Sequence, residues 1–327
     1  MRKNKVSIIA EFCQNHNGNT NILSKMIDKA VENGATHLKI QNIFANELTF
    51  RPKFENGIKI NKKIYSIKRP YKDEYKRLKK LELSIKQIQY FKKKCESYSV
   101  IPLITCFTRS QINLLKKLNF KLIKVASIDC ASYQLLRDLV DNFDEIIVST
   151  GGTYDNEIKK AASILNKKKF SFLHCVSIYP TPMESVNLSR LNYLKKFTKT
   201  VGYSDHTKYL DKNLIAIKFA IYLGAEIIEK HFTILNPKET RDGIVSMNEK
   251  QLNEISKFSK LSKSDQKLIL SKISKKFRNK LLGKSNRKLT DVELLNRDYY
   301  RGRFASTSKK NKTKRYIYNW DEVDNLK

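Results

Sequence analysis

The chain has 327 residues, 40% of them hydrophobic, and a formal net charge of +33 at pH 7. This length suffices for one large core, and no apolar run approaches the roughly 20 residues that a membrane-spanning helix needs. The composition therefore predicts a soluble globular protein rather than a membrane-embedded or disordered one. The basic start MRKNK leads into an apolar run that Glu11 interrupts, which is too short for a secretory signal, so we expect the first strand there.

Short apolar runs rich in Val and Ile recur eight times along the chain, at 6–12, 37–41, 101–107, 122–127, 145–150, 170–176, 200–206 and 226–232. Between them the sequence has the 3.6-residue periodicity of amphipathic helices, at 21–33, 85–97, 111–118, 133–140, 156–165, 213–222 and 249–261. Strands that are apolar on both faces and alternate with helices predict a parallel sheet with helical crossovers. Eight such units predict a (β/α)8 barrel. An open doubly wound sheet is the alternative, but no Gly-rich dinucleotide fingerprint follows any strand.

Two segments interrupt this alternation. The connection 42–84 is unusually long, and a loop of such length is usually functional or disordered. We expect it over the mouth of the barrel, either as a lid or as a solvated basic hairpin. Residues 263–327 are very basic and hold few apolar clusters, so we interpret 1–262 as the barrel domain and 263–327 as a C-terminal extension.

Polar residues gather at the C-terminal ends of the expected strands, which meet at the catalytic mouth of a barrel of this class. They are Glu11, Asn15, His16, Lys39, Gln41, Thr105, Lys124, Ser127, Asp129, Ser149, Thr150, His174, Tyr179, Ser204, Asp205, His206, Glu229, Lys230 and His231. A barrel with a purely structural role would not collect so many polar groups at one end. The mouth is therefore the candidate site.

Two histidines indicate a metal site. His206 and His231 end the seventh and eighth expected strands, so their imidazoles can share one divalent ion. Two His ligands leave positions open for water and substrate, which suits octahedral Mn, Mg or Co better than closed structural zinc. The alternative is a pair of hydrogen-bonded core histidines. His174 fits a core role equally well, and His37 lies at the opposite end of its strand, where we expect a structural role.

A carboxylate and two lysines indicate an anion site. Glu11 stands where the first strand should be apolar, so either a lysine neutralises it or it acts as an acid or base. Lys39 and Lys124 are embedded in apolar runs, and a lone inward lysine is often only a salt-bridge partner. Two of them predict a cradle for a phosphate or carboxylate, to which three hydroxyl groups would contribute: Thr105, Ser127 and Ser204.

The positive charge and the cysteines bear on possible partners and on the state of the thiols. Lys and Arg neutralise phosphates in nucleic-acid-binding proteins, but here they are spread through almost every expected helix, without a recognisable nucleic-acid module. We therefore expect no nucleic-acid partner, although the field would attract anionic substrates. An odd number of cysteines without C-x-x-C spacing predicts reduced thiols in a cytoplasmic protein. Three cysteines lie near strand ends: Cys13, Cys106 and Cys175. One of them could be a catalytic thiol, but we expect all three to be small buried side chains.

The order and spacing of eight segments match those of the sialic acid synthase family: AEFCQNHNG, LKIQ, ITCFTR, IKVAS, VSTGG, LHCVSIYPTP, VGYSDHT and IEKHFT. Over residues 5–262 the chain resembles N-acetylneuraminate synthases and relatives that make other nonulosonic acids. The resemblance implies a (β/α)8 barrel that condenses phosphoenolpyruvate with the open-chain aldehyde of an N-acetylated amino sugar, such as N-acetylmannosamine, and releases phosphate. It also implies a homodimer.

The resemblance implies roles for individual residues. A divalent metal held by His206 and His231 would polarise the aldehyde oxygen. Glu11 would manage the proton and the water as C3 of the enol attacks and water adds to C2. Phosphoenolpyruvate would be bound by Lys39, Thr105, Lys124, Ser127 and Ser204. The sugar would be faced by Gln41, Asp129, Tyr179 and Asp242.

The chain departs from the family pattern in three places. Asp129 stands where many members carry Glu, and Ser177 where some carry Asn. The family usually ends in an antifreeze-like domain that reaches across a dimer to the sugar, and residues 280–327 are too few for a whole copy. We expect the run NRDYYRGRFAS to be the first strand of a remnant, with Arg301 or Arg303 as its cation.

Two other functions fit parts of the pattern. One is another phosphoenolpyruvate-dependent synthase that makes a different 3-deoxy-sugar acid. The other is a basic nucleic-acid-binding protein on a catalytically inactive barrel. The intact set of Glu11, Lys39, His206 and His231 argues against the inactive barrel.

Overall fold

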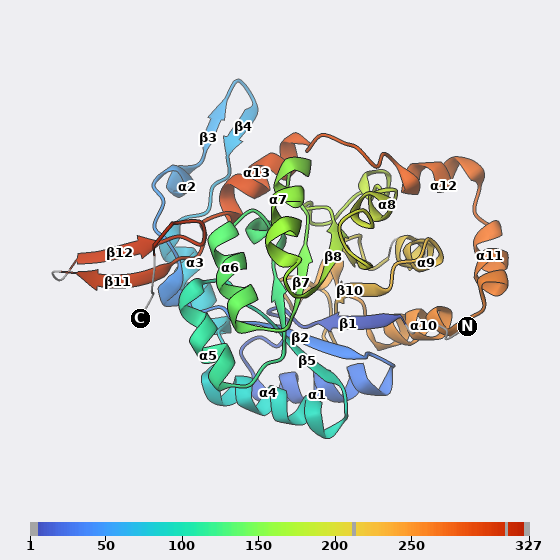
Figure 1. Cartoon of the computed structure of the whole chain (residues 1–327), viewed down its shortest axis with the longest axis horizontal. Helices are drawn as coiled ribbons and strands as arrows, with labels where there is room; N and C mark the ends of the chain where they lie inside the picture. Colours follow the sequence, from blue (N-terminus) through green and yellow to red (C-terminus); the bar gives the residue numbers. More distant parts are fainter. Residues whose placement is uncertain (1–5, 211–213, 311–312, 324–327) are drawn as a thin grey trace.

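The computed structural model describes residues 6–210, 214–310 and 313–323. Eight parallel strands close into a barrel, each followed along the chain by a helix on the outside, as Figure 1 shows. The strands are β1 (Ser7–Glu11), β2 (His37–Gln41), β5 (Ile101–Thr105), β6 (Leu122–Val125), β7 (Glu145–Ser149), β8 (Lys169–Cys175), β9 (Thr200–Asp205) and β10 (Ile227–His231). The predicted (β/α)8 barrel is confirmed, and the open sheet is excluded because β1 pairs with both β2 and β10.

The outer helices cover the barrel because each presents an apolar face to the strands. They are α1 (Thr20–Glu32), α4 (Ile85–Ser97), α5 (Ile112–Lys117), α6 (Tyr133–Asn142), α7 (Asp155–Leu165), α8 (Arg190–Leu194), α9 (Ile215–Tyr222) and α10 (Glu249–Lys260). In α1 this face consists of Leu23, Met26, Ile27 and Ala30, all buried, and Asn19 caps its first turn through its side chain. One continuous core between strands and helices results.

The interior of the barrel is layered. An apolar layer fills its lower part: Ile9, Leu103, Leu122, Ile147, Leu173 and Ile227. Side chains two residues apart on a strand point to the same face, so the next interior layer toward the mouth is fixed by the sequence. That layer is polar: Glu11, Thr105, Lys124, Ser149, Cys175 and Glu229. The alternation of the strands therefore places a polar layer directly on an apolar floor.

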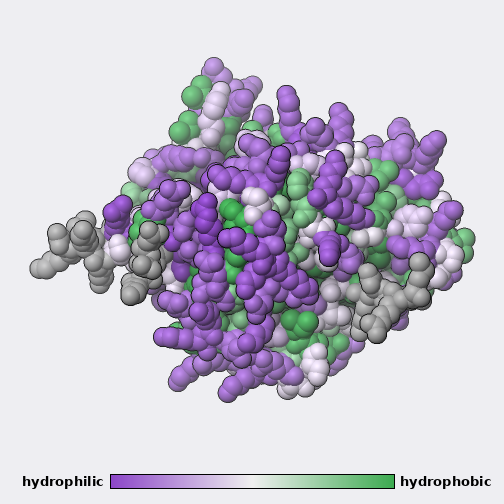
Figure 2. Space-filling view, viewed as in Figure 1, coloured by the Kyte–Doolittle hydropathy of each residue, from purple (hydrophilic) through white to green (hydrophobic). Residues whose placement is uncertain are grey.

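The long connection after β2 contains α2 (Lys53–Asn56), a hairpin of β3 (Ile58–Ile60) and β4 (Lys63–Ser66), and α3 (Tyr71–Leu81). The hairpin projects from the body of the molecule, and Figure 2 shows small hydrophobic areas on it within a largely hydrophilic face. Its exposed large side chains are Ile58, Ile60, Ile64 and Tyr65. The hairpin is exposed to solvent, as the second interpretation expects, and α3 contributes Glu74 and Arg77 to the wall of the barrel mouth; a role as a lid stays a prediction.

The C-terminal extension packs against the barrel. Helix α11 (Lys263–Ser271) contacts α9, α12 (Lys275–Leu282) follows, and α13 (Asp291–Tyr300) leads to a hairpin of β11 (Ser306–Lys310) and β12 (Thr313–Ile317). The strand expected over NRDYYRGRFAS is wrong, because these residues up to Tyr300 are helical. A capping box formed by Thr290 and Glu293 begins that helix. Among the described residues, none forms a helix that is both long and apolar enough to cross a membrane.

Candidate active site

A cavity of about 480 Å³ opens at the C-terminal ends of the barrel strands. The structure brings eleven of the twelve predicted site residues to its wall: Glu11, Lys39, Gln41, Thr105, Lys124, Ser127, Tyr179, Ser204, His206, His231 and Asp242. They come from strands far apart in sequence, and the closure of the barrel is what gathers them. The twelfth, Asp129, is not part of this wall.

Two buried lysines converge on one carboxylate at the bottom of the cavity. Lys39 Nζ lies 3.5 Å from Glu229 Oε2 and donates to Thr105 Oγ1 at 3.2 Å. Lys124 Nζ lies 3.9 Å from Glu229 Oε1 and donates to Ser149 Oγ at 2.7 Å. These partners hold both ammonium groups in place before any ligand binds.

Glu229 is a site residue to which the sequence assigned no role. Burial would raise the pKa of its carboxyl group, but Lys124 and Lys39 lower it to about 2, so it carries a negative charge. Ser204 Oγ donates to it at 2.7 Å. The signal that could have found it is its position two residues before His231, on the same face of β10.

Glu11 is partnered at both oxygens. Oε1 accepts the backbone N–H of Cys13 at 2.6 Å, and Oε2 forms an ion pair with Lys39. The side chain is 2% exposed, so neutralisation by a lysine accounts for its burial. The carboxylate also lines the cavity, so its position is compatible with a role as acid or base.

The two histidines lie side by side at the mouth. The ring centroids of His206 and His231 are 5.5 Å apart, and the Tyr179 ring packs edge-on 4.5 Å from His206. Burial, followed by the nearby His231, lowers the pKa of His206 to about 3. Burial likewise lowers the pKa of His231. Both imidazoles are therefore neutral near pH 7, which is the form that binds metal ions.

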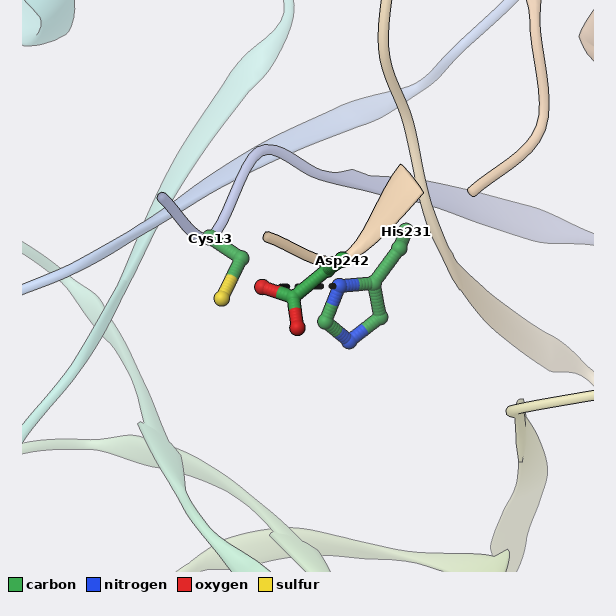
Figure 3. Close-up of side chains that lie close together, drawn as sticks. All are labelled: Cys13, His231 and Asp242. Carbon is green, nitrogen blue, oxygen red and sulfur yellow. Dashed lines mark ion pairs between the residues drawn. The ribbon is translucent and has the colours of Figure 1, made fainter. Parts of the chain in front are cut away.

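An orphaned nitrogen fits a metal site. The buried Nδ1 of His231 has no hydrogen-bond partner among the described residues, although buried polar atoms are normally paired. Asp242 Oδ2 lies 3.9 Å from this nitrogen. The thiol of Cys13 is the third metal-ligand group nearby, and the ligand atoms of the three residues lie within 4.8 Å of one another, as Figure 3 shows.

Asp129 lies away from the cavity wall. Its carboxylate accepts hydrogen bonds from Ser132 Oγ at 2.8 Å and from Asn319 Nδ2 at 2.9 Å. Burial raises its pKa to about 6. The structure thus gives Asp129 a contact with the C-terminal extension, and a contact with the sugar stays a prediction.

Several other mouth candidates point away from the cavity. Asp205 and Lys230 form an ion pair with both side chains at 0% exposure, on the faces of β9 and β10 that the helices cover. His174 is a core residue, whose Nε2 lies 2.6 Å from the Val186 carbonyl oxygen. His16 Nδ1 accepts the Gly18 N–H at 3.0 Å. Strand alternation explains the first pair, because these residues neighbour Ser204 and Glu229, which face inward.

The C-terminal extension supplies part of the wall from the same chain: Val292, Asn296, Tyr299, Tyr300 and Arg303. Arg303 forms an ion pair with Glu74 of α3, which also accepts from Arg77, so a guanidinium–carboxylate network joins the extension to the long connection. Arg301 lies over the Trp320 ring, 5.0 Å from its centroid. The sequence could not reveal this network, because it depends on how two irregular segments meet.

Comparison with known proteins gives a consistent result. The model of the NeuB family matches residues 26–267. An N,N'-diacetyllegionaminic acid synthase from Campylobacter jejuni is 33% identical over 81% of this chain and 82% of its own. A pseudaminic acid synthase from Campylobacter jejuni is 30% identical over 75% and 70%, respectively. A solved N-acetylneuraminic acid synthetase from Leptospira borgpetersenii superposes with a TM-score of 0.69 at 28% identity, covering 91% of this chain and 92% of that one.

Proposed function

This chain belongs to the NeuB family, and on this premise we propose that it condenses phosphoenolpyruvate with the open-chain form of an N-acetylated amino sugar. The products are a nonulosonic acid and inorganic phosphate. One observation carries the proposal beyond the family: a cradle with two lysines and a neutral histidine pair line the same cavity.

The cradle suits phosphoenolpyruvate because that molecule has two anionic groups on a small planar frame. Lys39 and Lys124 would each meet one group, since both ammonium groups lie near Glu229 and are held by hydroxyl partners. Hydroxyl groups on the wall would donate further hydrogen bonds: Thr105, Ser127 and Ser204. Ion pairing in this water-poor interior is stronger than at the surface.

The metal would be held by His206 and His231. When bound, a divalent cation supplies positive charge that stabilises the aldehyde oxygen as the new bond forms. The chain keeps both rings neutral and restricts them, because Tyr179 packs against His206. Mn, Mg and Co all suit a site with two imidazole ligands and open positions.

Glu11 would move the proton. When C3 of the enol bonds to the aldehyde carbon, C2 becomes electron-poor and a water adds to it. Glu11 faces the cavity from the end of β1 and would accept the proton of that water and pass it to the former aldehyde oxygen. The new hydroxyl group on C2 then loses its proton as the bond between C2 and the phosphate oxygen breaks, which leaves a ketone and inorganic phosphate. Its contact with Lys39 couples this base to the bound anion.

The sugar would occupy the outer part of the cavity. Gln41, Tyr179 and Asp242 line it from the barrel, and Asn296 and Arg303 line it from the extension. A homodimer stays a prediction, and the described wall already includes the extension of the same chain. A solved 3-deoxy-D-arabino-heptulosonate 7-phosphate synthase from Thermotoga maritima, at 12% identity and a TM-score of 0.56, shares the fold alone, so no observation favours that second activity.

The test is phosphate release from phosphoenolpyruvate across a panel of N-acetylated hexosamines, with and without Mn, Mg or Co. We expect release only when an amino sugar and a metal are both present. Release without sugar would indicate simple phosphatase activity, and no release with any panel member would contradict the proposal. A Lys124→Met variant is the negative control. It removes one ammonium group of the cradle, so we expect it to release much less phosphate than the parent.

A further inference from the structure

Cys13 adopts a backbone conformation that calls for an explanation. It lies two residues after the end of β1, and its φ of 46° lies in the left-handed region that residues with a side chain rarely adopt. The Glu11 carboxylate holds this turn by accepting the Cys13 N–H at 2.6 Å. Such strain persists where the surrounding structure enforces it, and it is concentrated at functional sites. The consequence here is that the thiol points into the cavity.

The thiol meets two other ligand groups there. Cys13, His231 and Asp242 come from the turn after β1, the end of β10 and the loop after β10, and their ligand atoms all lie within 4.8 Å of one another. Figure 3 shows the three side chains directed toward one another. Zinc and similar ions bind sulfur and nitrogen at about 2.0–2.3 Å, which brings donors to within roughly 4 Å of each other. Small side-chain rotations would therefore close this cluster on an ion.

Among the described residues, hydrogen bonding leaves one polar atom of the cluster without a partner. The 3.9 Å between His231 Nδ1 and Asp242 Oδ2 is too long for a hydrogen bond, and Nδ1 has no other partner in the described part of the chain. One buried nitrogen of the cluster is therefore left unsatisfied by the protein groups that the structure describes.

We propose that Cys13, His231 and Asp242 form a three-donor site for a borderline-soft divalent cation such as Zn²⁺ or Co²⁺. On binding, the Cys13 S–H bond breaks, the proton passes to the solvent and a sulfur–metal bond forms. A thiolate donor shifts preference toward Zn²⁺ and Co²⁺ and away from Mg²⁺ and Mn²⁺, which prefer oxygen ligands. The ion is the metal of the proposed function, on which this inference rests: Cys13 and Asp242 would bind it together with His231, in addition to His206.

The other cysteines provide controls. Cys106 is buried, and its thiol donates to the Thr108 carbonyl oxygen at 3.3 Å, away from this cluster. Cys175 Sγ lies 3.6 Å from His206 Nδ1. A Cys175→Ser variant therefore tests whether the thiolate ligand lies beside His206 instead. Cys13→Gly removes the thiol at a residue whose φ glycine adopts without strain, so we expect this variant to fold at least as well as the parent.

The test is spectroscopic and needs no turnover. The whole protein is stripped with a chelator and titrated anaerobically with Co²⁺, and the thiolate-to-cobalt charge-transfer band in the near ultraviolet is followed. We expect the band at one equivalent in the parent and in Cys106→Ser, and its loss in Cys13→Gly and Cys13→Ser, with Co²⁺ affinity at least tenfold weaker. Equimolar Zn²⁺ should abolish the band, whereas a large excess of Mg²⁺ should not.

Three results would overturn the proposal. They are Co²⁺ binding by calorimetry without the band, a band that survives in Cys13→Gly, and no Co²⁺ binding at all. A band lost in Cys175→Ser but kept in Cys13→Gly would show that the thiolate ligand is Cys175, and it would also refute the three-donor site. Phosphate release is measured separately, so failure of the site and failure of the condensation are distinguishable.

Discussion

Replacement of Glu11 by Gln separates the chemical step from binding. The amide oxygen can still accept the Cys13 N–H, so the turn after β1 is retained. The lost element is the negative charge beside Lys39, which keeps Glu229 Oε2 at 3.5 Å and Thr105 Oγ1 at 3.2 Å as partners. Affinity for phosphoenolpyruvate should therefore be retained or increase, because Lys39 loses one competing carboxylate.

The chemical step should slow by roughly 10²–10⁴-fold, the usual contribution of a positioned acid or base. That range corresponds to about 2.7–5.5 kcal/mol of activation free energy. Single-turnover phosphate release measures the step, and calorimetry with phosphoenolpyruvate measures binding. An equal loss in both would show that Glu11 is only an electrostatic partner of Lys39, and an unchanged rate would remove it from the mechanism.

Three further predictions test other parts of the account. His206→Ala should abolish metal-dependent turnover with little change in thermal stability, and retained activity would exclude His206 from the metal site. Removal of residues 289–327 leaves Leu270 and Leu281 in the core and should raise the amino-sugar KM more than the phosphoenolpyruvate KM, because Asn296 and Arg303 line the cavity; parent kinetics for both substrates would contradict this. Asp129→Asn should alter the pH dependence of stability, because the folded-state pKa of about 6 exceeds the ordinary 3.8. Between pH 4 and 6 the folded parent holds a proton that the unfolded chain has released. Its free energy of unfolding therefore falls by about 3 kcal/mol as the pH rises through this window, at 1.36 kcal/mol per pKa unit. The variant should lack this fall in urea unfolding, and an identical profile would show that Asp129 titrates normally.

The fold and the inner site could be predicted because strand alternation determines both. Each expected apolar run matches a barrel strand to within two residues, for example 122–127 against Leu122–Val125. Once Ile9 and Leu122 are placed inward, Glu11 and Lys124 must face the same interior. The same rule places Glu229 at the mouth, but its contact with both lysines depends on distances between strands that alternation does not give.

The outer site could not be predicted, because alternation ends where the strands end. Asp129 lies in a 3₁₀ turn, Ser127–Asp129, where side-chain direction no longer follows a period of two, and it contacts Asn319 instead of the cavity. The pair of Arg303 and Glu74 joins residues 229 apart in sequence. The helix α13 did have a signal, the capping pattern from Thr290 to Glu293, whereas the strand was expected only from the resemblance, as the first strand of an antifreeze-like remnant.

The central claim is that this cavity joins phosphoenolpyruvate to an amino sugar. The most direct measurement counts phosphate released and condensation product formed in the same reaction, with the product identified by mass spectrometry. We predict one phosphate per product whose mass is that of the amino sugar plus pyruvic acid, formed by the parent protein with a divalent metal and at least tenfold less by Lys124→Met. Phosphate without such a product, or equal product from Lys124→Met, would contradict the account.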